Sequence, residues 1–104
     1  MAIKTALTIF RGEDVVIPFD VDEDITSWTL SLYLSDTTGD STPTLTVSAS
    51  ITTAATGLCE VALTAAQTAA LSLPVYYWEL ARTNSGSVAV LAYGALTVLP
   101  RVPA

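Results

Sequence analysis

Apolar and polar residues alternate with a period of two along most of this chain, as they do in β-strands that bury one face. The clearest alternation covers residues 27–35, where Trp28 and three leucines fall on one face and Tyr33 falls on the other. Turn signals at intervals of about 8–12 residues separate about seven such segments, which is typical of an immunoglobulin-like antiparallel β-sandwich. The predicted strands cover residues 5–10, 14–20, 27–35, 44–51, 58–63, 75–83 and 88–99.

One segment departs from the alternation. Thr64 is followed three residues later by Gln67, which is the capping-box pattern of a helix N-terminus. Residues 65–71 suit one or two helical turns, and Pro74 cannot continue them. We therefore expect one short helical crossing, at about residues 64–71, inside an otherwise all-β fold.

Several residues refine the expected sandwich. Pro18 lacks an N–H, so its strand is predicted at a sheet edge or a bulge, and the first strand is predicted at an edge as well. Gly94 predicts a bulge in the last strand. Trp28 and Trp78 alternate with core leucines, so we expect them to anchor the core, one in each sheet. A polar loop at 36–43 and a hairpin turn at 84–87 complete a single domain over residues 1–104.

The composition favours contact with other protein. Hydrophobic residues make up 51% of the chain and charged residues 13%, against about 25% charged in an average soluble domain. The net charge of -6, with four basic residues, argues against binding to nucleic acid or to an anionic membrane surface. No apolar run resembles a signal peptide or approaches the roughly 18 residues of a membrane span. We expect synthesis in the cytoplasm, without secretion by a signal peptide.

The sequence offers little for catalysis. It contains no histidine, which excludes a Ser-His-Asp triad, a Cys-His pair and the commonest metal ligand. Cys59 is the sole cysteine, so it cannot form an internal disulfide, and we interpret it as a small buried side chain. Glu60 and Glu79 are predicted on strand faces away from the core, solvated or paired across strands with a residue such as Arg82. We predict that the protein is not an enzyme and needs no cofactor.

An acidic turn follows the second predicted strand. Asp20, Asp22, Glu23 and Asp24 supply closely spaced carboxylates, the ligand type that Ca²⁺ prefers. The EF-hand pattern fails, however, because Ser31 stands where the bidentate glutamate is required. The favoured interpretation is a solvated turn without a metal, and the candidate cation ligands are Asp20, Asp22 and Asp24.

Some large apolar residues are predicted to face outward. The alternation places Tyr33, Tyr77 and Leu58 away from the core, together with Leu91 and Tyr93 of the last strand. Exposed aromatic residues favour a protein interface, although loops or the short helix could instead cover them. The candidate interface residues are Tyr33, Tyr77, Leu58 and Tyr93.

Three segments together carry a family resemblance. The first is Phe10-Arg11-Gly12-Glu13-Asp14 with an apolar strand ending in Pro18-Phe19, and the second is the Trp28 strand after an Asp-Ile-Thr turn. The third is Leu-Thr-x-x-Gln-Thr-x-x-Leu at 63–71, then Tyr-Tyr-Trp-Glu-Leu at 76–80, a hairpin and the strand at 94–98. In this order they resemble small phage and prophage structural proteins of tails, baseplates or fibres. That group commonly has Gly-x-Tyr where this chain has Pro74-Val75-Tyr76.

The resemblance implies an immunoglobulin-like or baseplate-upper-protein-like sandwich that assembles with other virion proteins. It also implies a homo-oligomer, for example a trimer, located in the virion after synthesis in the bacterial host cytoplasm. The alternative hypothesis is a β-sandwich that binds a ligand or a carbohydrate, which would require Trp28 or Trp78 to be exposed on a concave face.

Overall fold

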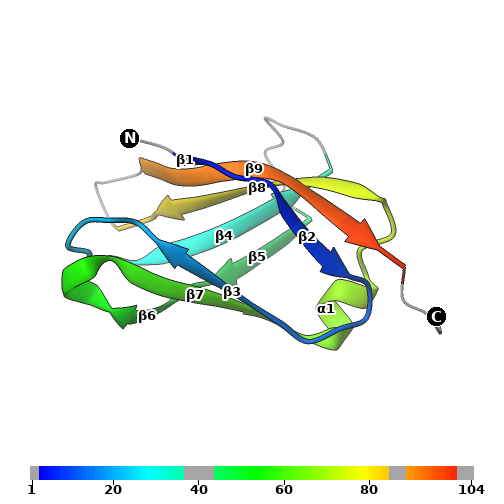
Figure 1. Ribbon diagram of the computed structural model, residues 1–104, viewed down its shortest axis with the longest axis horizontal. Coiled ribbons are helices and arrows are strands. Elements are labelled where there is room, and N and C mark those ends of the chain that lie inside the picture. Colours follow the sequence, from blue (N-terminus) through cyan, green and yellow to red (C-terminus); the bar gives the residue numbers. More distant parts are fainter. Residues whose placement is uncertain (1–2, 37–43, 85–88, 101–104) are drawn as a thin grey trace.

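A computed structural model describes residues 3–36, 44–84 and 89–100, and over these residues the chain folds as a two-layered β-sandwich with one short α-helix (Figure 1). The all-β prediction is therefore confirmed. The larger sheet has the strand order β1-β9-β8-β4-β5, with β2 also paired to β9, and the smaller sheet has the order β3-β7-β6. The predicted loop at 36–43 and turn at 84–87 lie mostly outside the described residues.

The strands follow the predicted ranges closely. The large sheet contains β1 (Ile3–Lys4), β2 (Leu7–Phe10), β4 (Leu30–Ser35), β5 (Leu45–Ser48), β8 (Val75–Arg82) and β9 (Ala89–Leu99). The small sheet contains β3 (Val15–Asp20), β6 (Ser50–Thr53) and β7 (Leu58–Leu63). A 3₁₀ turn, η1 (Ala54–Thr56), and the helix α1 (Ala65–Ala69) lie at opposite ends of the sandwich (Figure 1).

The described residues form more strands than predicted, because β1 precedes the first predicted strand and because one predicted strand changes sheets. The segment predicted at 44–51 forms β5 in the large sheet and β6 in the small sheet. Between them, the Ala49 N–H donates to the Leu30 carbonyl oxygen at 2.9 Å. This crossing joins the two sheets along one side. On the opposite side, β2 and β3 lie at sheet edges, as the sequence predicted for the first strand and for the strand that contains Pro18, and the short β1 lies at an edge as well.

The first strand departs from the predicted antiparallel pairing. β1 and β2 pair in parallel with β9, in a register that joins Leu7 to Leu96 and Phe10 to Leu99. The other strand pairs of the described residues are antiparallel. Period-two alternation shows which face of a strand is buried, and it carries no information about the direction of the neighbouring strand.

The core lies between the two sheets and follows the alternation. Leu30, Leu32 and Leu34 of β4 are buried, as predicted for that strand. The rings of Phe19 and Trp78 meet across the sandwich, with their centroids 5.4 Å apart. Further buried side chains come from both sheets and from the connecting segments, and they include Ile9, Ile17, Ile25, Cys59, Val61, Leu63, Leu71, Tyr76, Leu80, Leu96 and Val98.

The two tryptophans do not anchor opposite sheets, which corrects the prediction. Trp78 is buried on β8, but Trp28 is half-buried and precedes β4, so neither tryptophan lies in the small sheet. Ser27 turns the chain with a positive φ of 65°, and the Trp28 N–H donates to the Ile25 carbonyl oxygen. This turn holds Trp28 outside the strand, and Phe19 takes the place opposite Trp78.

The irregularity in β9 lies at Leu91 rather than at Gly94. Leu80 pairs with Ala92 and Ala81 pairs with Val90, so Leu91 is the extra residue of a bulge. The bulge reverses the alternation of side chains between the two faces of the strand. Leu91 is therefore buried, although it was predicted to face outward, whereas Tyr93 faces outward as predicted.

Candidate interaction surfaces

The helix α1 begins as the sequence predicts. The Gln67 N–H donates to Thr64 Oγ1 at 3.2 Å, and the Thr64 N–H donates to Gln67 Oε1 at 2.9 Å, which completes the capping box. The Ala65 N–H also donates to the Asp14 carboxylate at 2.7 Å. The helix ends at Ala69, and Leu71 turns into the core. The expected helical crossing is therefore present.

The turn between β2 and β3 also forms hydrogen bonds with this helix and with the segment that follows it. Arg11 Nε donates to the Leu71 carbonyl oxygen at 2.6 Å, and Thr68 Oγ1 donates to the Glu13 carbonyl oxygen at 2.8 Å. The first and third segments of the family resemblance thus contact each other. Their contacts join α1 to the sandwich, which is a structural role.

The acidic turn is held together by its own hydrogen bonds. The Asp22 N–H donates to Asp20 Oδ1 at 2.9 Å, and the Thr26 N–H donates to Asp24 Oδ1 at 2.9 Å. The Thr26 hydroxyl and then the Thr26 amide lower the pKa of Asp24. Across the described residues, no three His, Cys, Asp or Glu side chains are placed to hold a metal ion. The structure therefore does not bring the three candidate cation ligands together as a site.

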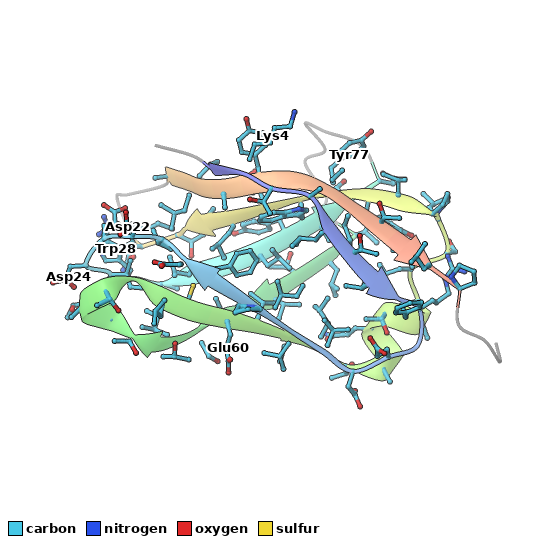
Figure 2. All side chains as sticks on the ribbon, in the orientation of Figure 1. Lys4, Asp22, Asp24, Trp28, Glu60 and Tyr77 are labelled. Carbon is cyan, nitrogen blue, oxygen red and sulfur yellow. The ribbon has the colours of Figure 1, made fainter. Side chains whose placement is uncertain are left out.

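Trp28 lies beside the acidic turn, at the end of the sandwich (Figure 2). The Arg82 guanidinium carbon is 4.3 Å from the centroid of the Trp28 ring. Asn84 Oδ1 accepts from Arg82 Nε at 3.1 Å and from the Thr29 N–H at 2.7 Å, which holds the guanidinium in place. Arg82 thus covers one face of Trp28, and Trp78 is buried in the core.

The outer face of the large sheet gathers three of the predicted interface residues. Tyr33 pairs with Glu79, Glu79 pairs with Tyr93, and Tyr93 pairs with Lys4, so these four residues form one row across the sheet. Tyr77 lies in the next row, and its side chain points away from the core in Figure 2. We call this surface the tyrosine face, and its larger residues are Lys4, Phe10, Tyr33, Val75, Tyr77, Glu79, Val90, Tyr93 and Leu99.

The tyrosine face is the most apolar surface that the described residues present. In these residues, six of the nine exposed large hydrophobic side chains lie on it. Tyr77 and Tyr93 are 41% and 42% exposed, and Tyr33 is half-buried. Among the described strand residues of this face, only Lys4 and Glu79 carry charge, and their charges are opposite.

Leu58 does not join the tyrosines. It lies on β7, on the outer face of the small sheet, where it pairs with Asp20 and is 39% exposed. Figure 2 shows Glu60 of the same strand pointing away from the side that carries Tyr77. The predicted interface residues therefore divide between the two outer surfaces. Glu60 and Glu79 are separated in the same way, so they do not form a carboxylate pair.

Cys59 is buried, as its interpretation as a small core side chain requires. Burial raises the pKa of its thiol, and the negative charge of Asp20 raises it further. Both effects favour the neutral thiol, which is a poor nucleophile.

A scan against protein-family models and a search of curated proteins matched nothing. In the parts of the chain that the structure describes, no helix is both long and apolar enough to cross a membrane.

Proposed function

We propose that this protein is a non-enzymatic structural module that assembles with other protein chains through the tyrosine face. The observation that carries the proposal is the concentration of exposed apolar side chains on that one face. Contiguous exposed apolar surface, rich in tyrosine and poor in charge, is typical of protein interfaces. The resemblance of three sequence segments to phage and prophage proteins supports a virion assembly, in a tail, a baseplate or a fibre attachment.

The charge distribution is compatible with a second copy of the chain as one of the partners. The chain carries a net charge of -6, which opposes the approach of two copies. The opposite charges of Lys4 and Glu79 leave the strand residues of the tyrosine face near neutrality, while the acidic turn lies at one end of the sandwich. Contact through this face therefore brings little like charge together. A closed homo-oligomer, for example a trimer, suits a symmetric position in a virion.

Light scattering coupled to size exclusion, at several protein concentrations, tests the proposal. We expect a homo-oligomer of the 10.9 kDa chain. Tyr77→Glu combined with Tyr93→Glu should shift the protein to the monomer, because burying two carboxylates in the contact is unfavourable. Thermal unfolding of the variant verifies that it is folded.

Leu58→Glu is the matched control, since Leu58 has nearly the same exposure on the opposite surface. It should leave the oligomer intact. If the two variants dissociate equally, the tyrosine face is not the contact surface. A wild-type protein that is monomeric at every concentration would contradict self-assembly.

A further inference from the structure

One row of the tyrosine face carries opposite charges on the two sides of a tyrosine. Tyr93 of β9 pairs with Lys4 of β1 on one side and with Glu79 of β8 on the other. Figure 2 shows Lys4 and Tyr77 pointing to the same outer side of the large sheet. Within the described part of the chain, neither Lys4 nor Glu79 has an ion-pair partner. Both charges are therefore available to a group outside their own chain.

We propose that two copies of the chain pack their tyrosine faces together around a two-fold axis that runs along β9 over Tyr93. Because β1 and β8 flank β9, this axis places β1 of each copy over β8 of the other. Two-fold contacts are reciprocal, so Lys4 of each copy then pairs with Glu79 of the other. This inference rests on the proposed function, and it specifies the symmetry and the register of the contact with a second copy.

The two charges distinguish this axis from other ways of stacking the same face. An axis along the row, across the strands, would place every residue of the row over itself, so that lysine meets lysine and glutamate meets glutamate. An axis over β8 would likewise place Glu79 over Glu79. Like charges across a contact oppose binding, whereas opposite charges fix its register. Only an axis at right angles to the row, through its midpoint at Tyr93, pairs both ions.

Charge exchange tests this register in solution. Lys4→Glu and Glu79→Lys each place like charges at both contacts, so each variant alone should dissociate roughly tenfold more readily than the wild type, or more. An equimolar mixture should form a heterodimer, because the two acidic positions of one variant face the two lysines of the other. Labelling one variant with ¹⁵N lets native mass spectrometry separate the heterodimer from both homodimers. A mixture without an excess of heterodimer would overturn the proposal.

Glu60→Lys is the matched control for Glu79→Lys, because it makes the same change in net charge on the outer face of the small sheet. Mixed with Lys4→Glu, it should give no excess of heterodimer. An excess equal to that of Glu79→Lys would overturn the proposal, since net charge would then explain the pairing. Thermal unfolding verifies that the variants are folded.

Cross-linking locates the axis without changing either charge. Packed sheets lie about 10 Å apart, so a short bismaleimide should join two copies of Tyr93→Cys, which face each other on the axis. Tyr33→Cys is the matched control, because Tyr33 lies two strands from β9 in the same row. Its two copies are about 19 Å apart along the sheets and should not be joined. Cys59 is buried, and the wild type verifies that it does not react. Equal cross-linking at both positions would overturn the proposal.

These results separate the inference from the function on which it rests. A wild-type trimer would overturn the two-fold contact and leave assembly through the tyrosine face in place. Dissociation by Tyr77→Glu with Tyr93→Glu, without a heterodimer in the charge-exchange mixture, would do the same. A wild-type monomer at every concentration would overturn both the two-fold contact and self-assembly.

Discussion

At the scale of single residues, Gly12, Gly57 and Gly94 lack a side chain for different reasons. Gly12 has a φ of +81° with open space around its Cα, so the backbone conformation alone favours glycine. Gly94 has no positive φ, but a Cβ there would overlap the Thr5 carbonyl oxygen. Gly57 combines both constraints, since its φ is +85° and a Cβ would overlap the main chain of Glu23.

Substituting each glycine by alanine should therefore give graded losses of stability. Gly12→Ala should lower the free energy of unfolding by about 1 kcal/mol, which is the cost of a strained backbone. Gly94→Ala should cost more than about 2 kcal/mol, because main-chain atoms must move to make room. Gly57→Ala should also cost more than Gly12→Ala, because it adds an overlap with the main chain to the strained backbone. Urea unfolding measures all three, and equal losses at Gly12 and Gly94 would contradict the overlap with Thr5.

Cys59 should make stability dependent on pH in the alkaline range. Its pKa in the folded protein is raised above the usual 9.0, first by burial and then by Asp20. Well below pH 9.0, the thiol keeps its proton in both the folded and the unfolded chain, so it adds no pH dependence to stability. As the pH rises through 9.0, the thiol of the unfolded chain ionises first. The free energy of unfolding then falls by at most about 1.4 kcal/mol per pH unit.

The thiol contribution is isolated by comparing the wild-type protein with Cys59→Ala between pH 8 and pH 10. Urea unfolding of both proteins gives two pH profiles, and the other titrating groups cancel in their difference. The wild-type stability should fall more steeply. Parallel profiles would show that the thiol has the same pKa in both states.

At the scale of elements, the short helix depends on its tertiary contacts. Five residues are too few for a stable isolated helix in water. The capping box satisfies the first N–H groups locally, but Asp14, Arg11 and Glu13 supply contacts from a distant turn. The side chain of Thr68, which is fully buried, lies in the contact between α1 and the turn that joins β2 to β3.

Thr68→Val should weaken the contact between α1 and the turn that joins β2 to β3, with little change in side-chain volume. The substitution removes the donor to the Glu13 carbonyl oxygen, and we expect a loss of about 1–2 kcal/mol in the free energy of unfolding. Thr8→Val on β2 is the matched control, because Thr8 is exposed, and it should change stability by less than about 0.5 kcal/mol. Thermal or urea unfolding compares them. Similar effects at both positions would contradict a stabilising role for the Thr68 bond.

At the scale of the whole molecule, the sandwich separates three environments. The tyrosine face covers the outside of the large sheet, the acidic turn occupies one end, and a pocket lined by residues of β2, β3, β8 and β9 lies between the open edges of the two sheets. The strand β5–β6 joins the sheets on the opposite side. This arrangement places the tyrosine face and the pocket on different surfaces of the molecule.

The sequence by itself determined the features that depend on neighbouring residues. Burial of Leu30, Leu32 and Leu34 follows from alternation within β4, and the start of α1 follows from Thr64 and Gln67. The exposure of Tyr77 also follows from alternation, because successive side chains of a strand point to opposite faces. Each of these features needs only a few consecutive residues.

Tertiary structure alone decided what lies next to each strand. Alternation marks a face as outward but does not say to which sheet it belongs, so Leu58 and the tyrosines were grouped although they lie on opposite surfaces. The parallel partner of β2 and the change of sheets at Ala49 depend on distant segments. The bulge at Leu91 is a feature of the register between β8 and β9, and the pocket beside Trp78 forms between the two sheets, so neither follows from a local pattern.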